Sequence, residues 1–172
     1  MTELDEAWRQ MLADAITGAK ADGRHDVADY LSLKAANDAI RTTAVKWLFD
    51  SMLEIAGSAN RKGAAVAIER IEPFSFQYRG ANLVGSQMRL VYGVRCLTVE
   101  AGWTRTPADG FMRGGALAVA RIRHFGVTRA NVELALRREE NAPVWFDLAS
   151  AGTEGILSSE HLIRHFLVLL DR

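Results

Sequence analysis

The sequence predicts a protein of the α+β class, with N-terminal helices, an antiparallel β-meander of about five or six strands, and a C-terminal helix. Three observations lead to this prediction. Residues 1–60 repeat apolar side chains at intervals of three and four, which is helical spacing. Residues 64–149 show short alternating runs between turn residues, which is typical of strands, and residues 158–171 return to helical spacing. Because helices and strands occupy separate stretches, an α+β fold is expected rather than an alternating α/β fold.

Length and composition predict a single domain, residues 1–172, built from these three parts. The chain has 172 residues, of which 49% are hydrophobic and 24% charged, as in ordinary globular proteins. Its one cysteine, Cys96, cannot form an intramolecular disulfide. The acidic N-terminus lacks the features of a secretory signal, and no apolar run is long enough to span a bilayer. We therefore expect a cytoplasmic protein without a membrane partner.

The helical part should contain at least two helices. The first has one apolar stripe and should end in the glycine-containing segment 18–23; the stripe consists of Trp8, Met11, Leu12, Ala15 and Ile16. A second helical pattern covers residues 26–56, which is long for a globular protein. It fits either one long helix or two helices with a break near Asn37 or Thr42–Thr43.

The sheet part begins with two runs on either side of Pro73, followed by a turn region at Gly80–Gly85. The clearest strand pattern is Gln87–Val99, read as a single strand in which even-numbered residues from Met88 to Cys96 face the core. A long loop, Gly102–Gly115, precedes the remaining predicted strands, which are Ala116–Phe125, Val132–Leu136 and Val144–Leu148.

The C-terminal helix should start after Ser158 or Ser159, either of which can cap it. Between Leu162 and Leu170 its apolar residues cover nearly the whole circumference. A helix that is apolar on all sides is buried, so this one is expected to pack inside the domain or in a homodimer.

The charges are unevenly distributed although the formal net charge is zero. Residues 79–129 contain eight arginines, no lysine, and only two acids, Glu100 and Asp109. A GC-rich genome explains the preference for arginine over lysine, but it does not explain the scarcity of acids. This basic block is therefore the first place to look for a binding site.

An arginine-rich sheet face is one candidate site within this block. If the two strands around the long loop pair with Cys96 opposite Ala120, four arginines share the face opposite the core: Arg89, Arg95, Arg121 and Arg123. Like charges so close need an offset. Either acids such as Glu133 neutralise them, or the face binds an anion through the planar guanidinium groups.

The loop 102–115 is the second candidate, because long loops often carry function. It combines aromatic, basic and acidic side chains with glycines that let a ligand approach the backbone, and its candidate residues are Trp103, Arg105, Asp109, Phe111 and Arg113. The loop lacks the lysine and hydroxyl residue of a P-loop. The alternative is a purely structural turn in which Trp103 and Phe111 pack over the sheet edge.

Other combinations of reactive residues give weaker signals. Cys96 and His124 are expected to lie too far apart for a nucleophile and its base. His161 and His165 have the spacing of two ligands on one helix, but no third ligand is apparent. We therefore predict no metal and no cofactor.

The leading functional hypothesis is a non-catalytic protein that binds an anionic small molecule or an acidic partner. The predicted ligand-binding residues are Arg95, Trp103, Arg105, Asp109, Arg113, Arg121 and Arg123. One alternative is a small enzyme acting on an anionic substrate at this place, with Glu100, Asp109 or His124 transferring protons. A further alternative is single-stranded nucleic-acid binding, against which the zero net charge argues.

Overall fold

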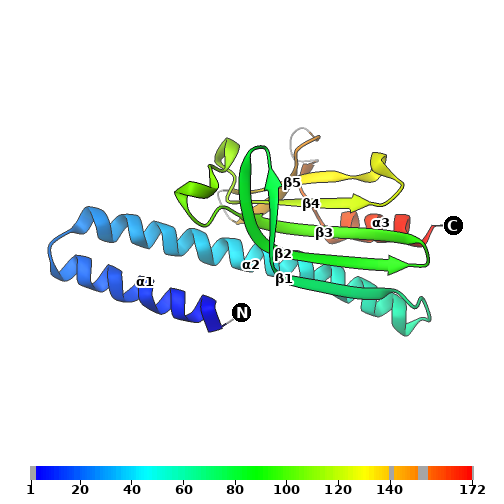
Figure 1. The fold of residues 1–172 in the computed structure, drawn as a ribbon, viewed down its shortest axis with the longest axis horizontal. Coiled ribbons are helices and arrows are strands. Elements are labelled where there is room, and N and C mark those ends of the chain that lie inside the picture. The colour runs from blue at the N-terminus through cyan, green and yellow to red at the C-terminus, as the bar shows by residue number, and fades with distance from the viewer. Residues whose placement is uncertain (1–2, 140–141, 151–154, 172) are drawn as a thin grey trace. The chain divides into compact units, whose positions relative to one another are not determined.

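The computed structural model describes residues 3–139, 142–150 and 155–171, which form an α+β fold as the sequence predicts (Figure 1). The chain divides into two compact units, residues 1–42 and 43–172. The helices are α1 (Glu3–Ala21), α2 (His25–Arg61) and α3 (Ser159–Leu170). The strands are β1 (Ala67–Tyr78), β2 (Ala81–Tyr92), β3 (Arg95–Trp103), β4 (Ala118–His124), β5 (Val132–Arg138) and β6 (Pro143–Asp147).

The first unit contains α1 and the first part of α2. The helices meet at the predicted glycine-containing turn, where Gly23 has a φ of 71° and Arg24 N donates to Ala19 O. The two helices contact each other through Lys34, whose Nζ lies 5.1 Å from the centre of the Trp8 ring. The second helix continues to Arg61 without a break at Asn37 or Thr42–Thr43, so the one-helix alternative is correct.

The second unit is a six-stranded antiparallel sheet in which strands follow chain order, β1 to β6. The end of α2 and all of α3 cover one face, which we call the helix face (Figure 1). Leu48, Phe49 and Met52 of α2 are fully buried, and Trp145 Nε1 of β6 donates to Ala44 O of α2 at 3.2 Å. In α3 one side is buried within the domain, through Leu162, Phe166 and Leu169, and burial of the other side in a homodimer stays a prediction.

The region predicted as a single strand from Gln87 to Val99 is a hairpin. Tyr92 pairs with Arg95, and Gly93, with a φ of 60°, and Val94 form the turn. Successive side chains along a strand point to opposite faces of the sheet. The two-residue turn therefore changes whether the even-numbered or the odd-numbered residues face the core. In β3 the odd residues, Leu97 and Val99, are buried on the helix face, whereas the even ones face the other side.

The hairpin of β1 and β2 bends over the other side of the sheet, which we call the outer face (Figure 1). Its register shifts between Ile71 and Phe74, and in the adjacent ladder Gly85 of β2 pairs with Gly102 of β3. A Cβ on Gly85 would lie 1.9 Å from Ala101 O, so only glycine permits this approach. The predicted turn at 80–85 is shorter than expected, because β2 begins at Ala81.

The bend creates a second, smaller core on the outer face. Phe76, Ala81, Leu83 and Val119 are buried there, with Phe74, Tyr78 and Met112 packed around them.

Within the described ranges, no helix is both long enough and apolar enough to cross a membrane.

Candidate functional site

The predicted face with four arginines does not form, because Arg95 lies on the helix face. Its Nη1 donates to Val168 O near the C-terminal end of α3 at 3.1 Å. The positive charge also interacts favourably with the helix dipole at that end. The turn at Gly93–Val94 is the reason, because it pairs Arg95 with Tyr92 and so places Arg95 on a different face from Arg89. Thr98, and not Arg95, is the residue of β3 that lies on the outer face opposite Arg123. The assignment of Arg95 to an arginine-rich face was therefore wrong.

Arg121 and Arg123 do lie together on the outer face, but a buried carboxylate pairs with both. Glu100 is 1% exposed, and its Oε1 lies 2.5 Å from Arg121 Nη2 and 3.1 Å from Arg123 Nη2. Gln87 Nε2 donates to Glu100 Oε2 at 3.2 Å, and the Arg121 guanidinium lies 5.0 Å from the centre of the Phe76 ring. These two guanidinium groups therefore stabilise the fold beneath the bent hairpin.

Three loop residues also have partners within the loop. The Asp109 carboxylate accepts hydrogen bonds from Thr106 N at 2.8 Å and Arg105 N at 3.1 Å. Hydrogen bonds from the Thr106 backbone and side chain lower the pKa of Asp109. The Arg105 guanidinium stacks 3.9 Å from the centre of the Trp103 ring, and Trp103 is 6% exposed. Asp109, Arg105 and Trp103 thus fix the shape of the first half of the loop.

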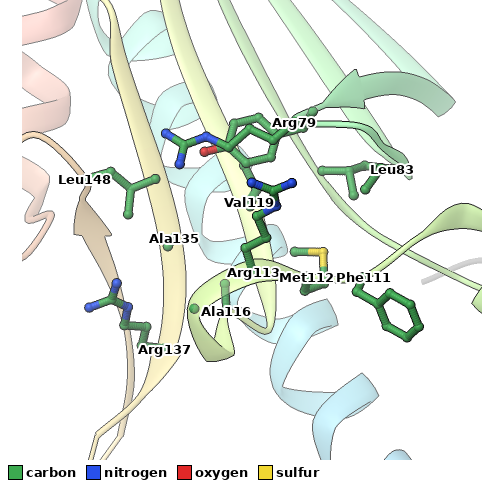
Figure 2. Close-up of a pocket in the computed structure, with 13 residues that line it drawn as sticks. Arg79, Leu83, Phe111, Met112, Arg113, Ala116, Val119, Ala135, Arg137 and Leu148 are labelled. Atoms are coloured by element: carbon green, nitrogen blue, oxygen red, sulfur yellow. The ribbon is translucent and has the colours of Figure 1, made fainter.

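Arg113 is the predicted residue that lines a hollow, on the outer face (Figure 2). The hollow has a volume of about 130 Å³ and lies between the bent hairpin, the loop and β5. Its surface combines an apolar floor with arginines, and the lining residues are Tyr78, Arg79, Ala81, Leu83, Phe111, Met112, Arg113, Gly114, Ala116, Val119, Ala135, Arg137 and Leu148. All of them belong to the second unit.

Arginines from three different segments line this hollow. Arg79 Nη2, in the hairpin turn, lies 3.1 Å from Glu133 Oε2, and Arg137 of β5 lies 5.6 Å from the Phe146 ring centre. The guanidinium of Arg113 forms no hydrogen bond, ion pair or ring contact with any residue in the described part of the chain. Figure 2 shows Arg79 and Arg113 entering the hollow from separate segments. The rim is therefore more positive than its one carboxylate, Glu133, can neutralise.

The hydroxyl of Tyr78 at this rim donates to Glu133 Oε2 at 3.0 Å. Burial and this hydrogen bond raise the pKa of Tyr78, so its hydroxyl stays protonated at neutral pH. Among the residues that the structure describes, the lining contains no carboxylate, histidine or cysteine. The hollow thus offers charge and apolar surface but no group suited to proton transfer near pH 7.

The histidines predicted as possible metal ligands have separate partners. His165 Nδ1 lies 3.0 Å from His124 Nε2 across the interface between α3 and β4, and His161 Nδ1 accepts from Ser158 N at 3.1 Å. His124 shares the helix face with Leu97, while Cys96 faces the other way, so the two do not form a pair. No group of three potential metal ligands lies together among the described residues.

Sequence reasoning missed Arg79, Arg137 and the apolar floor. The sequence signal for these residues was weak. The alternation of Phe74, Phe76 and Tyr78 indicates a strand, but it does not indicate that the strand bends over its neighbours. The floor becomes visible only when Val119 and Ala135, adjacent on β4 and β5, are placed beneath that hairpin. No protein-family model, curated protein or solved structure matches this chain.

Proposed function

We propose that this protein binds a small anionic molecule, or an anionic group of a partner, in the hollow beside Arg79, Arg113 and Arg137. The observation that carries the proposal is Arg113, a guanidinium at the rim without a partner among the described residues. Arginine suits this role because its planar guanidinium can donate two parallel hydrogen bonds to two oxygens of a carboxylate or phosphate.

Local charge and polarity support the same conclusion. Among the described residues, three arginines line the hollow, and Glu133 is the carboxylate that pairs with one of them, Arg79. The apolar floor of Ala81, Leu83 and Val119 lowers the local dielectric constant, which strengthens attraction between a bound anion and these cations. Pockets with apolar walls and a few convergent polar groups are the usual form of small-molecule sites.

The alternatives receive less support from the geometry. The proposed proton-transfer residues of the enzyme hypothesis are engaged elsewhere: Glu100 with two arginines, Asp109 with the loop backbone, and His124 with His165. For nucleic-acid binding, Trp103 offers no ring surface on which a base can stack because it is 6% exposed, and of the loop aromatics only Phe111 is exposed. Binding without catalysis is therefore the function we favour.

Arg113→Gln is the direct test, because it removes one charge from an exposed side chain. Calorimetry with inorganic phosphate and with acetate should show binding to the wild type that weakens roughly 10-fold in this variant, as for loss of a charged hydrogen bond. Arg129→Gln is the matched control, since Arg129 is exposed and does not line the hollow. Absence of binding to the wild type, or an equal loss in the control, would refute the proposal.

Homodimerisation stays a prediction. On α3, Ile163 and Leu167 are 43% and 55% exposed, so these apolar side chains are the part of the helix that a second copy would cover. Sedimentation of the wild type and of Leu167→Glu would test this. The cytoplasmic location likewise stays a prediction.

A further inference from the structure

The segment that carries Arg113 also presents a large apolar side chain to solvent. Phe111 lines the hollow and is 83% exposed, while its neighbour Met112 is partly buried against the small core of the outer face. Figure 2 shows the Phe111 ring pointing away from that core. An exposed aromatic ring at the edge of an apolar hollow is a common feature of surfaces that bind a ligand.

Glycines bracket this segment on both sides. Gly110 has a φ of 97°, and Gly114 and Gly115 have φ values of 65° and 69°, which are conformations that other residues rarely adopt. Before Gly110 the backbone is held by Asp109, and after Gly115 Leu117 N donates to Leu136 O at 2.8 Å. Residues 111–113 therefore form a short strap between two fixed points, with a hinge at each end.

The hollow is too small to enclose more than part of a ligand. Its volume is about 130 Å³. Pockets for organic ligands have volumes of roughly 300–1,000 Å³. A ligand held by Arg79 and Arg113 would thus extend toward the strap, where the neighbouring side chain is Phe111.

We propose that the ligand is an amphiphilic anion, in which a phosphate or carboxylate is attached to an aromatic or other flat apolar group. Arg113 and Arg79 hold the anionic group, and the Phe111 ring moves over the apolar group as the strap turns at its glycines. The apolar floor, which includes Leu83, Val119 and Ala135, contacts the other side of that group. This inference rests on the proposed function and adds the chemical class of the ligand.

A matched pair of probes tests the inference: inorganic phosphate and phenyl phosphate, each titrated calorimetrically into the whole protein. Phenyl phosphate should bind about 10-fold more tightly, because its ring gains apolar contact and ring stacking. In Phe111→Ala this preference should largely disappear, while affinity for inorganic phosphate stays unchanged. Arg113→Gln should weaken both probes.

Phe125→Ala is the control, because Phe125 is 76% exposed and does not line the hollow. Thermal melting of each variant verifies that it folds. If both probes bind the wild type equally, or if Phe111→Ala keeps the preference, the amphiphilic ligand is refuted while the anion site stands. If neither probe binds, the proposed function fails, and this inference fails with it.

Discussion

The helix face and the outer face of the sheet accommodate buried polar groups in different ways. On the helix face, His124 and His165 contact each other, and burial lowers the pKa of both, which keeps them uncharged near neutral pH. On the outer face, Glu100 is buried among guanidinium groups instead. Uncharged groups suit a surface enclosed by helices, whereas charged groups suit one that water still reaches at its edges.

The outer face itself contains two different groups of arginines. Arg121 and Arg123 share a buried carboxylate, whereas the hollow has three arginines and only the half-exposed Glu133. Proximity of arginines in the sequence therefore does not identify a binding site. The two groups differ in that the buried Glu100 pairs with both Arg121 and Arg123, whereas the guanidinium of Arg113 in the hollow has no partner among the described residues.

The largest effect is expected from Glu100→Gln, which removes the charge that Arg121 and Arg123 share. Breaking a buried ion pair leaves uncompensated charge, so the free energy of unfolding should fall by about 3–5 kcal/mol, measured by urea denaturation. Glu69→Gln is the control, because the Glu69–Arg89 pair of 2.7 Å is exposed. Equal losses in the two variants would remove the distinction between buried and exposed pairs on this face.

The next largest effect is expected from Gly85→Ala, which tests the bend that creates the hollow. The added Cβ would collide with Ala101 O, and overpacking of this kind costs about 1–3 kcal/mol. Because the bent hairpin carries Arg79 and Tyr78 to the hollow, phosphate binding should also fall. Gly80→Asn is the control. A Cβ added at position 80 would have no atom within 4 Å, and asparagine tolerates the φ of 86° at this position. A Gly85→Ala protein with unchanged stability would contradict the close approach.

The smallest effect is expected from pH, which tests the uncharged pair on the helix face. Burial, assisted by the charges of His124, His161 and Arg164 and opposed by Asp147, lowers the pKa of His165 from 6.5 to about 4. Below pH 6.5 the unfolded state binds more protons than the folded state, so stability falls as pH drops from 6.5 toward 4. Urea midpoints at pH 7 and pH 5 measure this loss.

His165→Gln is the comparison for the pH experiment, since glutamine keeps a hydrogen-bonding group but does not titrate. Its midpoint should change less between pH 7 and pH 5 than that of the wild type. If the two proteins respond identically, groups other than His165 cause the acid sensitivity.

Most of the fold could be predicted from sequence because local patterns determine it. Helical spacing predicted α1 and α3, and the glycine-containing segment 18–23 predicted the turn after α1. The hairpin within 87–99 was missed because apolar residues alternate across Gly93 without interruption. That single glycine was the available turn signal, and it decides on which face of the sheet Arg95 lies.

Less of the site could be predicted, because it depends on contacts between distant segments. Arg113 was identified from its loop, whereas Arg79 and Arg137 are 58 residues apart in the sequence and both line the hollow. They do so because Gly85 and Gly102 allow two strands to approach each other closely, and nothing in either segment alone indicates that contact. Pairing of Glu100 with two arginines likewise required the register of β3 and β4.

The exposed edge of β1, the outermost strand, is poorly suited to pairing with a strand of another molecule. Its exposed middle combines Glu69, Arg70 and Glu72 with Pro73, which has no backbone N–H to donate. Charges and proline on an unpaired strand discourage a second sheet from adding to it. At the opposite side, Ile156 bridges to Phe146 and covers part of β6. Both edges of the sheet therefore disfavour continuous β-sheet extension by another strand.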